Sequence, residues 1–211
     1  MNGMGFMIRL LLILLLISSC GNLPITYLQN FSSVNNVVFG FPEYEITADI
    51  YNEYENSFIK IRFGRGPHAI LVLAYIKDDI YEWVGSDDVK IFTFNGRIIK
   101  TSGLDNNIEI PKPLDNIFLA TAEVYESINL YNPDLYYATA KRSISSKNSS
   151  IKKLGQEIKV NKVRERFDID SIGWSGTNIF YQNTQTNQIE FSEQQIHPRL
   201  PAVKIEYYFK Y

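Results

Sequence analysis

Histidines and closely spaced carboxylates are the side chains in this sequence that could do acid–base or metal chemistry. His68 and His197 are the only histidines in the 211 residues, and two isolated histidines make a poor metal site and a weak case for a general base. Asp168 and Asp170 are two residues apart, so a strand would place both carboxylates on one face, and glycosidases use such paired acids. Acids at this spacing usually face solvent, and we therefore predict no catalytic residues, no metal ion and no cofactor.

Three short motifs resemble functional signatures but lack the structural context that those signatures need. Residues 64–69 fit G-x-G-x-x-A, yet a proline and an apolar strand follow where a helix should hold the phosphate. Ser149 and Lys152 fit S-x-x-K, which requires a helix, whereas this stretch is typical of a loop. Residues 173–176 have the wrong spacing for a nucleophile elbow, and we expect Trp174 to pack against the core.

Aromatic side chains are the most promising candidates for ligand binding. The sequence contains 14 Tyr, 13 Phe and 2 Trp. Such rings stack on the faces of sugars, and their polar tips can reach sugar hydroxyls. The same side chains could instead form an ordinary aromatic core. The residues that could line a groove are Tyr131, Tyr136, Tyr137, Trp174, Phe180 and Tyr181.

The charges are distributed unevenly along the chain. Residues 141–166 contain nine basic and two acidic side chains, a net of +7, whereas residues 20–140 contain eight and sixteen, a net of −8. The acidic balance of the whole chain, −2, argues against general nucleic-acid binding. The basic stretch predicts either a solvated loop, around residues 145–153, and a strand edge protected by lysine, or a surface for an acidic glycan or lipid phosphate. The contributors would be Lys141, Arg142, Lys152, Lys153, Lys159, Lys162, Arg164 and Arg166, of which the last three alternate onto one side of a strand.

The elements that would position these residues are mostly strands. Ile46, Ile50 and Tyr54 recur every four residues and predict one short amphipathic helix. The apolar run 69–76 predicts a strand buried on both faces, and Asn95-Gly96 between two β-rich runs predicts a tight hairpin. A second hairpin is expected from the 178–182 and 188–196 runs, and residues 203–211 alternate as a half-buried strand does. The pattern predicts an all-β, mainly antiparallel, partly open barrel or barrel-like sandwich with one short N-terminal helix.

The N-terminal segment indicates export. An apolar run from Leu10 follows Arg9 and ends in small residues at Cys20, the only cysteine. This is typical of a secretory signal and resembles a bacterial lipoprotein signal, in which the cysteine is lipidated. A transmembrane helix is the alternative, but Arg9 and the serines before Cys20 shorten the run below the roughly 20 residues that a bilayer requires. We expect a signal peptide at 1–19, a lipidated Cys20 and tether at 20–41, and one domain at 42–211, with Met1, Met4 or Met7 as the start.

Several segments together resemble the YjbF/GfcB family of outer-membrane lipoproteins, which are linked to exopolysaccharide or capsule production and secretion. They are Gly64–Ala74, Trp83-Val84, Asn95–Leu104, Tyr137–Ala140, and Ser192–Gln194 with Pro198 and Pro201. The resemblance implies an all-β, partly open barrel and provides no catalytic residues to carry over. Members often have a Tyr-Trp pair near the penultimate hairpin, where this chain has Phe180-Tyr181.

The resemblance implies a non-enzymatic lipoprotein on the periplasmic face of the outer membrane, with a polysaccharide and polysaccharide-export proteins as possible partners. The glycine that follows Cys20 favours the outer over the inner membrane by analogy. A carrier of lipid or another hydrophobic ligand inside an open barrel is the second hypothesis. A glycan-processing enzyme is the third.

Overall fold

The computed structural model describes residues 41–210, with the exceptions of Asp87 and Asn116. Cys20, the signal segment and the tether up to residue 40 lie outside the described residues. The unit from Phe41 onward is compact. Within the described part of the chain, no helix is long and apolar enough to cross a membrane. The elements are α3 (Ala48–Glu53), β1 (Phe58–Phe63), β2 (His68–Lys77), β3 (Ile80–Val84), β4 (Lys90–Phe94), β5 (Arg97–Ser102), β6 (Ile108–Glu109), β7 (Val124–Leu130), β8 (Leu135–Lys153), β9 (Gln156–Ile169), β10 (Trp174–Asn183), β11 (Ile189–Gln194) and β12 (Val203–Tyr208), with short 3-10 turns at Ile117–Leu119 and Asp170–Ile172.

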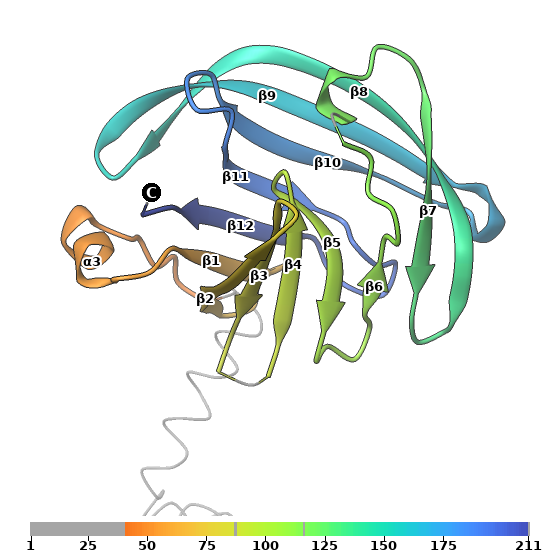
Figure 1. Cartoon of the computed structure of the whole chain (residues 1–211), viewed down its shortest axis with the longest axis horizontal. Coiled ribbons are helices and arrows are strands. Elements are labelled where there is room, and N and C mark those ends of the chain that lie inside the picture. Colours follow the sequence, from red (N-terminus) through yellow and green to blue (C-terminus); the bar gives the residue numbers. More distant parts are fainter. Residues whose placement is uncertain (1–40, 87, 116, 211) are drawn as a thin grey trace, which may run out of the picture. The chain divides into compact units, whose positions relative to one another are not determined.

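The strands form a closed antiparallel barrel (Figure 1). Each strand pairs with the next along the chain, and β12 pairs with β1 to complete the ring. Closure leaves no open edge where the first and last strands meet. The predicted all-β barrel with a short helix before it is therefore confirmed, and the ring is closed rather than partly open.

The barrel interior contains the main hydrophobic core. Val203, Ile205 and Tyr207 of β12 are buried in it, as the alternation predicts. The Asn95-Gly96 turn is confirmed, because both residues have positive φ, 50° and 72°, between β4 and β5.

The strand predicted to be buried on both faces is β2, and that prediction is wrong, because Leu71 is its one buried residue and Ala69 is exposed. Tyr75 and Ile76 are exposed. Among the described residues, β1 pairs with β2 only as far as Val72. The rest of β2 has only β3 beside it, so both of its faces meet solvent.

Strands β8 and β9 are much longer than the barrel wall requires. In the described residues, β7 pairs with β8 only as far as Arg142, and β10 pairs with β9 only as far as Val160. Beyond those points β8 and β9 pair with each other alone, and they extend past the wall as a hairpin (Figure 1). The loop predicted for residues 145–153 is therefore wrong, because this polar stretch is held as a strand by its pairing with β9. At the hairpin tip, Leu154 packs on the outside of the barrel beside Phe58 and Tyr208.

Candidate functional site

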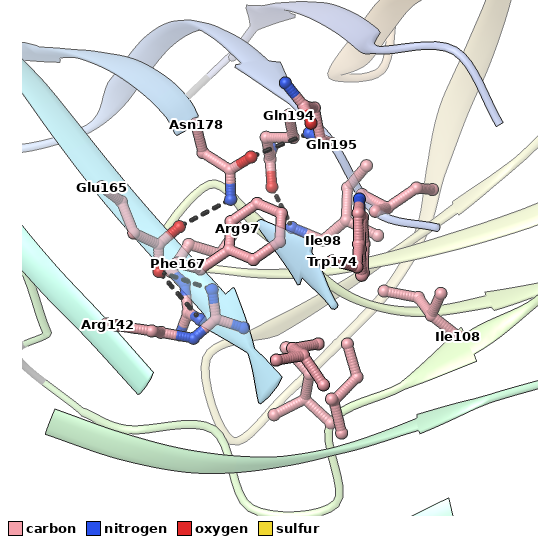
Figure 2. Close-up of a pocket in the computed structure, with 14 residues that line it drawn as sticks. Arg97, Ile98, Ile108, Arg142, Glu165, Phe167, Trp174, Asn178, Gln194 and Gln195 are labelled. Atoms are coloured by element: carbon pink, nitrogen blue, oxygen red, sulfur yellow. Dashed lines mark hydrogen bonds and ion pairs between the residues drawn. The ribbon is translucent and has the colours of Figure 1, made fainter. Parts of the chain in front are cut away.

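Strands β5, β7, β8 and β9 bring charged side chains into the barrel interior, and Figure 2 shows three of them, Arg97, Arg142 and Glu165. Arg97 donates to both oxygens of Glu126, at 3.1 and 2.6 Å. Arg142 lies 2.8 Å from Glu126 and donates to Glu165 at 3.0 Å. All four side chains are at most 5% exposed. We call Arg97, Glu126, Arg142 and Glu165 the buried cluster.

The buried cluster is neutral overall and densely hydrogen-bonded. Asn178 donates to Glu165 at 2.7 Å, and the backbone N–H of Leu114 donates to Glu126 at 3.1 Å. Burial would raise the pKa of Glu126, but the hydrogen bond and charge of Arg97 hold that pKa below its ordinary value. Both carboxylates are therefore occupied by arginines, and the cluster links side chains of β5, β7, β8 and β9.

The cavity beside the buried cluster is small. Its volume is about 20 Å³, close to the space that one water molecule needs. Trp174 lines it and packs edge-on against Phe167, with 4.8 Å between the ring centroids. Phe180 is completely buried in the same core. This cavity offers no space for a hydrophobic ligand, as a carrier would require.

The aromatic candidates do not form a single groove, and for Trp174 and Phe180 the alternative, an ordinary aromatic core, is confirmed. Trp174 and Phe180 belong to the core, whereas Tyr181 lies on the outer face of β10, where it lines a groove. Tyr136 and Tyr137 are 52% and 76% exposed near the start of β8. Tyr181 of β10 pairs with Lys162 of β9, and Lys162 pairs in turn with Lys147 of β8, so Tyr181 is in register with Lys147. Ten residues of strand therefore separate Tyr137 from that position, roughly 33 Å.

Three of the predicted cations do project together, from the outer face of β9. Arg164 and Arg166 are exposed and Lys162 is half-buried. Lys147 of β8 is in register with Lys162. Among the described residues, no carboxylate lies within 4.0 Å of these four cations. We call Lys147, Lys162, Arg164 and Arg166 the basic face; it borders a depression of about 260 Å³.

Three other cations of the basic stretch, Arg142, Lys153 and Lys141, do not contribute to this face. Arg142 points into the barrel as part of the buried cluster, and Lys153 is largely buried and pairs with Glu190 at 2.6 Å. Lys141 is exposed but pairs with Glu123 at 3.0 Å. The prediction that Arg142 and Lys153 face a ligand on this surface is therefore wrong. The β8 edge beyond Arg142 carries Lys147, as expected of an edge that lysine protects.

A groove of about 590 Å³ lies next to the basic face. Its floor is the outer surface of β10, β11, β12 and β1, and it includes Tyr181, Phe191, Glu206 and Lys60. One wall is the β8–β9 hairpin from Ser149 to Lys153, and the other is the segment before α3. This volume falls in the usual range for small-molecule sites. The further lining residues are Glu43, Tyr44, Glu45, Ser150, Ile151, Lys152 and Glu190.

Two ion pairs, Lys60–Glu206 and Lys153–Glu190, lie in the groove. Lys60 lies 2.6 Å from Glu206, and its ammonium also donates to the Tyr44 carbonyl at 2.7 Å. Burial lowers the pKa of Lys153, although the charge of Glu190 opposes that shift. Among the described residues no group of three His, Cys, Asp or Glu side chains is arranged to hold a metal ion.

Sequence reasoning missed the buried cluster and the groove for different reasons. Val163, Glu165 and Phe167 are spaced by two, so they lie on the same face of β9. The sequence pattern therefore already placed a carboxylate on the apolar face of this strand. The sequence therefore contained a signal for an inward-facing carboxylate on β9. The groove had no comparable signal, because its floor joins β10, β11 and β12 to β1, which lies far from them in the sequence.

Comparison with known proteins places the chain in a family. The family model described as "Group 4 capsule polysaccharide lipoprotein gfcB, YjbF" matches residues 31–208. The chain belongs to the YjbF family. This confirms the resemblance seen in the sequence and associates the protein with capsule lipoproteins.

Individual relatives of this YjbF-family chain come from Escherichia coli K12. The lipoprotein YjbF is 26% identical over 194 residues, covering 88% of this chain and 89% of its own length. The lipoprotein GfcB is 24% identical over 149 residues, covering 66% and 70%. The crystal structure of the lipoprotein YmcC has a TM-score of 0.69 at 19% identity, covering 90% of this chain and 98% of its own, and shows the same fold.

Proposed function

We propose that this YjbF-family protein is a non-enzymatic accessory factor in exopolysaccharide or capsule assembly or export. It would act at the periplasmic face of the outer membrane, held there by lipid on Cys20. The basic face is the observation that carries the proposal. The family description supplies the capsule context, and the role of the buried carboxylates as partners of arginine supports a binding protein over an enzyme.

The basic face suits an acidic polymer. Its cations are free of carboxylate partners within the described residues, so a ligand need not displace an internal ion pair. Lys162 lies with its ammonium 5.2 Å from the centroid of the Tyr181 ring, which places an aromatic surface beside the charges. Exposed charges interact over about 8–10 Å at physiological salt, so repeated acidic groups of a polymer can engage several cations at once.

Replacing Lys162, Arg164 and Arg166 together by glutamine is expected to abolish most binding of an acidic polysaccharide and to reduce polymer export. The fold should persist, because exposed substitutions usually change the free energy of unfolding by less than about 0.5 kcal/mol each. Binding by the parent protein should weaken steeply as salt rises. A pull-down with the cell's acidic polymer at several salt concentrations, together with an export assay in cells, measures both effects.

The matched control is the triple glutamine variant at Lys77, Lys90 and Lys100, which removes the same charge from β2, β4 and β5. Equal loss of binding in both triple variants would show that net charge matters and the basic face does not. Normal export and normal polymer binding by the Lys162, Arg164 and Arg166 variant would refute the proposed site. Polymer-export genes beside this gene would independently support the pathway.

The lipid anchor gives a separate prediction. Cys20→Ser is expected to move the protein from the membrane to the soluble fraction, because buried acyl chains contribute roughly 0.8 kcal/mol per CH₂ and stable anchoring needs more than one chain. Fractionation of cells with a high-salt wash tests this. If intact Cys20→Ser protein still pellets with outer membranes, the lipid is not what holds it there.

A further inference from the structure

We propose that the groove beneath the β8–β9 hairpin binds uncharged sugar rings of the polymer whose acidic groups contact the basic face. The inference deepens the proposed function and rests on it. It assigns neutral saccharide recognition to Tyr181 and Phe191, with hydroxyl contacts from Lys60, Glu206, Lys153 and Glu190.

The register of the barrel joins the two surfaces into one strip. Lys162 is opposite Tyr181, Tyr181 is opposite Phe191, and Phe191 is opposite Glu206. Glu206 is in turn opposite Lys60. Neighbouring strands lie about 4.8 Å apart, so the four steps from Lys162 to Lys60 cover roughly 19 Å. A flexible chain that reaches the basic face therefore enters the groove by continuing across the strands.

The floor of the groove offers an aromatic platform. Tyr181 and Phe191 are half-buried, and their rings meet at 62° with centroids 5.5 Å apart. Their packing against each other reduces the rotamer freedom that binding would otherwise remove. Sugar rings present apolar C–H faces and a rim of hydroxyls, and half-buried tyrosine and phenylalanine fit such faces.

The two ion pairs of the groove suit hydroxyls better than ions. The Lys60–Glu206 and Lys153–Glu190 pairs are each 2.6 Å long, so the attraction of either lysine for a phosphate or carboxylate is largely neutralised. Carboxylates accept from sugar hydroxyls and ammonium groups donate to them, while Ser149 and Ser150 add hydroxyls on the wall. An acyl chain would strip water from these charges without replacing their hydrogen bonds, which is unfavourable.

Further hydrogen bonds hold the polar groups in place before a ligand arrives. Glu206 accepts from the Tyr208 hydroxyl at 2.5 Å, and Glu190 accepts from Asn183 at 2.8 Å. Lys153 also donates to the Tyr207 carbonyl and lies over the Tyr208 ring, 4.6 Å from its centroid. A site that is already ordered loses little conformational entropy on binding.

The test is titration of neutral hexasaccharides of glucose, galactose, mannose and N-acetylglucosamine into the full chain, in a detergent without a sugar headgroup. We expect at least one hexasaccharide to bind with an affinity that changes less than about twofold between about 0.05 and 0.5 M salt, since no net charge is engaged. Tyr181→Ala should weaken that binding by about tenfold or more. Tyr137→Ala, which removes an exposed tyrosine elsewhere on β8, should leave it unchanged.

A second variant tests the proposal if Tyr181→Ala does not fold. Ser150→Trp alters an exposed hairpin residue that lines the groove, and the added indole should block neutral sugars without disturbing the core. A double glutamine variant at Arg164 and Arg166, which keeps Lys162 over the Tyr181 ring, should keep neutral binding while weakening binding of the acidic polymer, so the two proposals fail separately. Absence of neutral binding at millimolar concentration, or binding that neither Tyr181→Ala nor Ser150→Trp reduces, overturns the groove assignment.

Discussion

Replacing Glu126 by glutamine is expected to lower the free energy of unfolding by about 3–5 kcal/mol, the usual cost of removing one partner from a buried ion pair. The Glu126 side chain is completely buried and accepts from both nitrogens of the Arg97 fork. The glutamine amide would turn donors toward the donors of Arg97 and Arg142. Two arginines would then share Glu165 as their one remaining carboxylate in the buried cluster. Urea-induced unfolding of parent and variant measures the difference.

The control is Glu109→Gln, which removes a carboxylate from a partly exposed pair with Lys100, also 2.8 Å long. Exposed pairs contribute about 0–1 kcal/mol, so this variant should unfold almost as the parent does. If the two variants lose equal stability, burial is not what makes the cluster important.

Acidification should erode the contribution of Glu126. Its pKa is lowered in the folded state, so the unfolded state takes up the proton first, near the ordinary value of about 4.3. The stabilisation is fully present above that pH and is lost as the pH falls through the folded pKa. The difference in the free energy of unfolding between the parent and Glu126→Gln should therefore decrease below about pH 4. Groups that titrate in both proteins contribute equally to both and do not affect this difference. If that difference in the free energy of unfolding did not change with pH, the glutamine would be acting through its shape alone.

Gly96→Ala is expected to destabilise the protein by about 2–6 kcal/mol through two separate effects. The residue has φ of +72° in the β4–β5 turn, which strains any side chain. A Cβ at this position would also lie 2.4 Å from the Ile189 Cγ1 atom and 2.5 Å from its Cβ. The barrel would have to shift β11 or reopen the turn. A thermal or urea melt measures the loss.

Gly155→Ala separates the two effects. Gly155 has a similar φ of +78° at the β8–β9 turn, but nothing lies within 4 Å of a Cβ there. This variant should therefore show only the backbone strain, of about 1–3 kcal/mol. Equal losses at both glycines would mean that Ile189 yields without cost and that the contact across the barrel is unimportant.

Local sequence patterns predicted the elements whose determinants are local. The Asn95-Gly96 dipeptide determines its turn because positive φ at both positions depends on those residues. Alternation in β12 and in β9 identified the inward and outward side chains, including the shared face of Lys162, Arg164 and Arg166. The family motifs identified the family, which the match over residues 31–208 confirms.

Non-local pairing caused the errors. The apolar run of β2 looked buried, but the partner strand ends before Tyr75. The Ser-rich part of β8 looked like a loop because its own propensity is weak, and pairing with β9 overrides that propensity. Arg142 lies within the basic stretch of the sequence. It shares one face of β8 with Ala138 and Ala140, however, so its side chain points into the barrel.

Local patterns along the chain thus predict the class of fold, the turns, the family and the side of β9 on which three cations lie. Pairing between strands is what closes four charges into a neutral buried cluster and brings Tyr181, Phe191, Glu206 and Lys60 into one groove, while Trp174 lies on the opposite face from Tyr181. The physical reason is register. A strand's own residues define its two faces, but which residues of other strands lie beside them depends on pairings between distant segments.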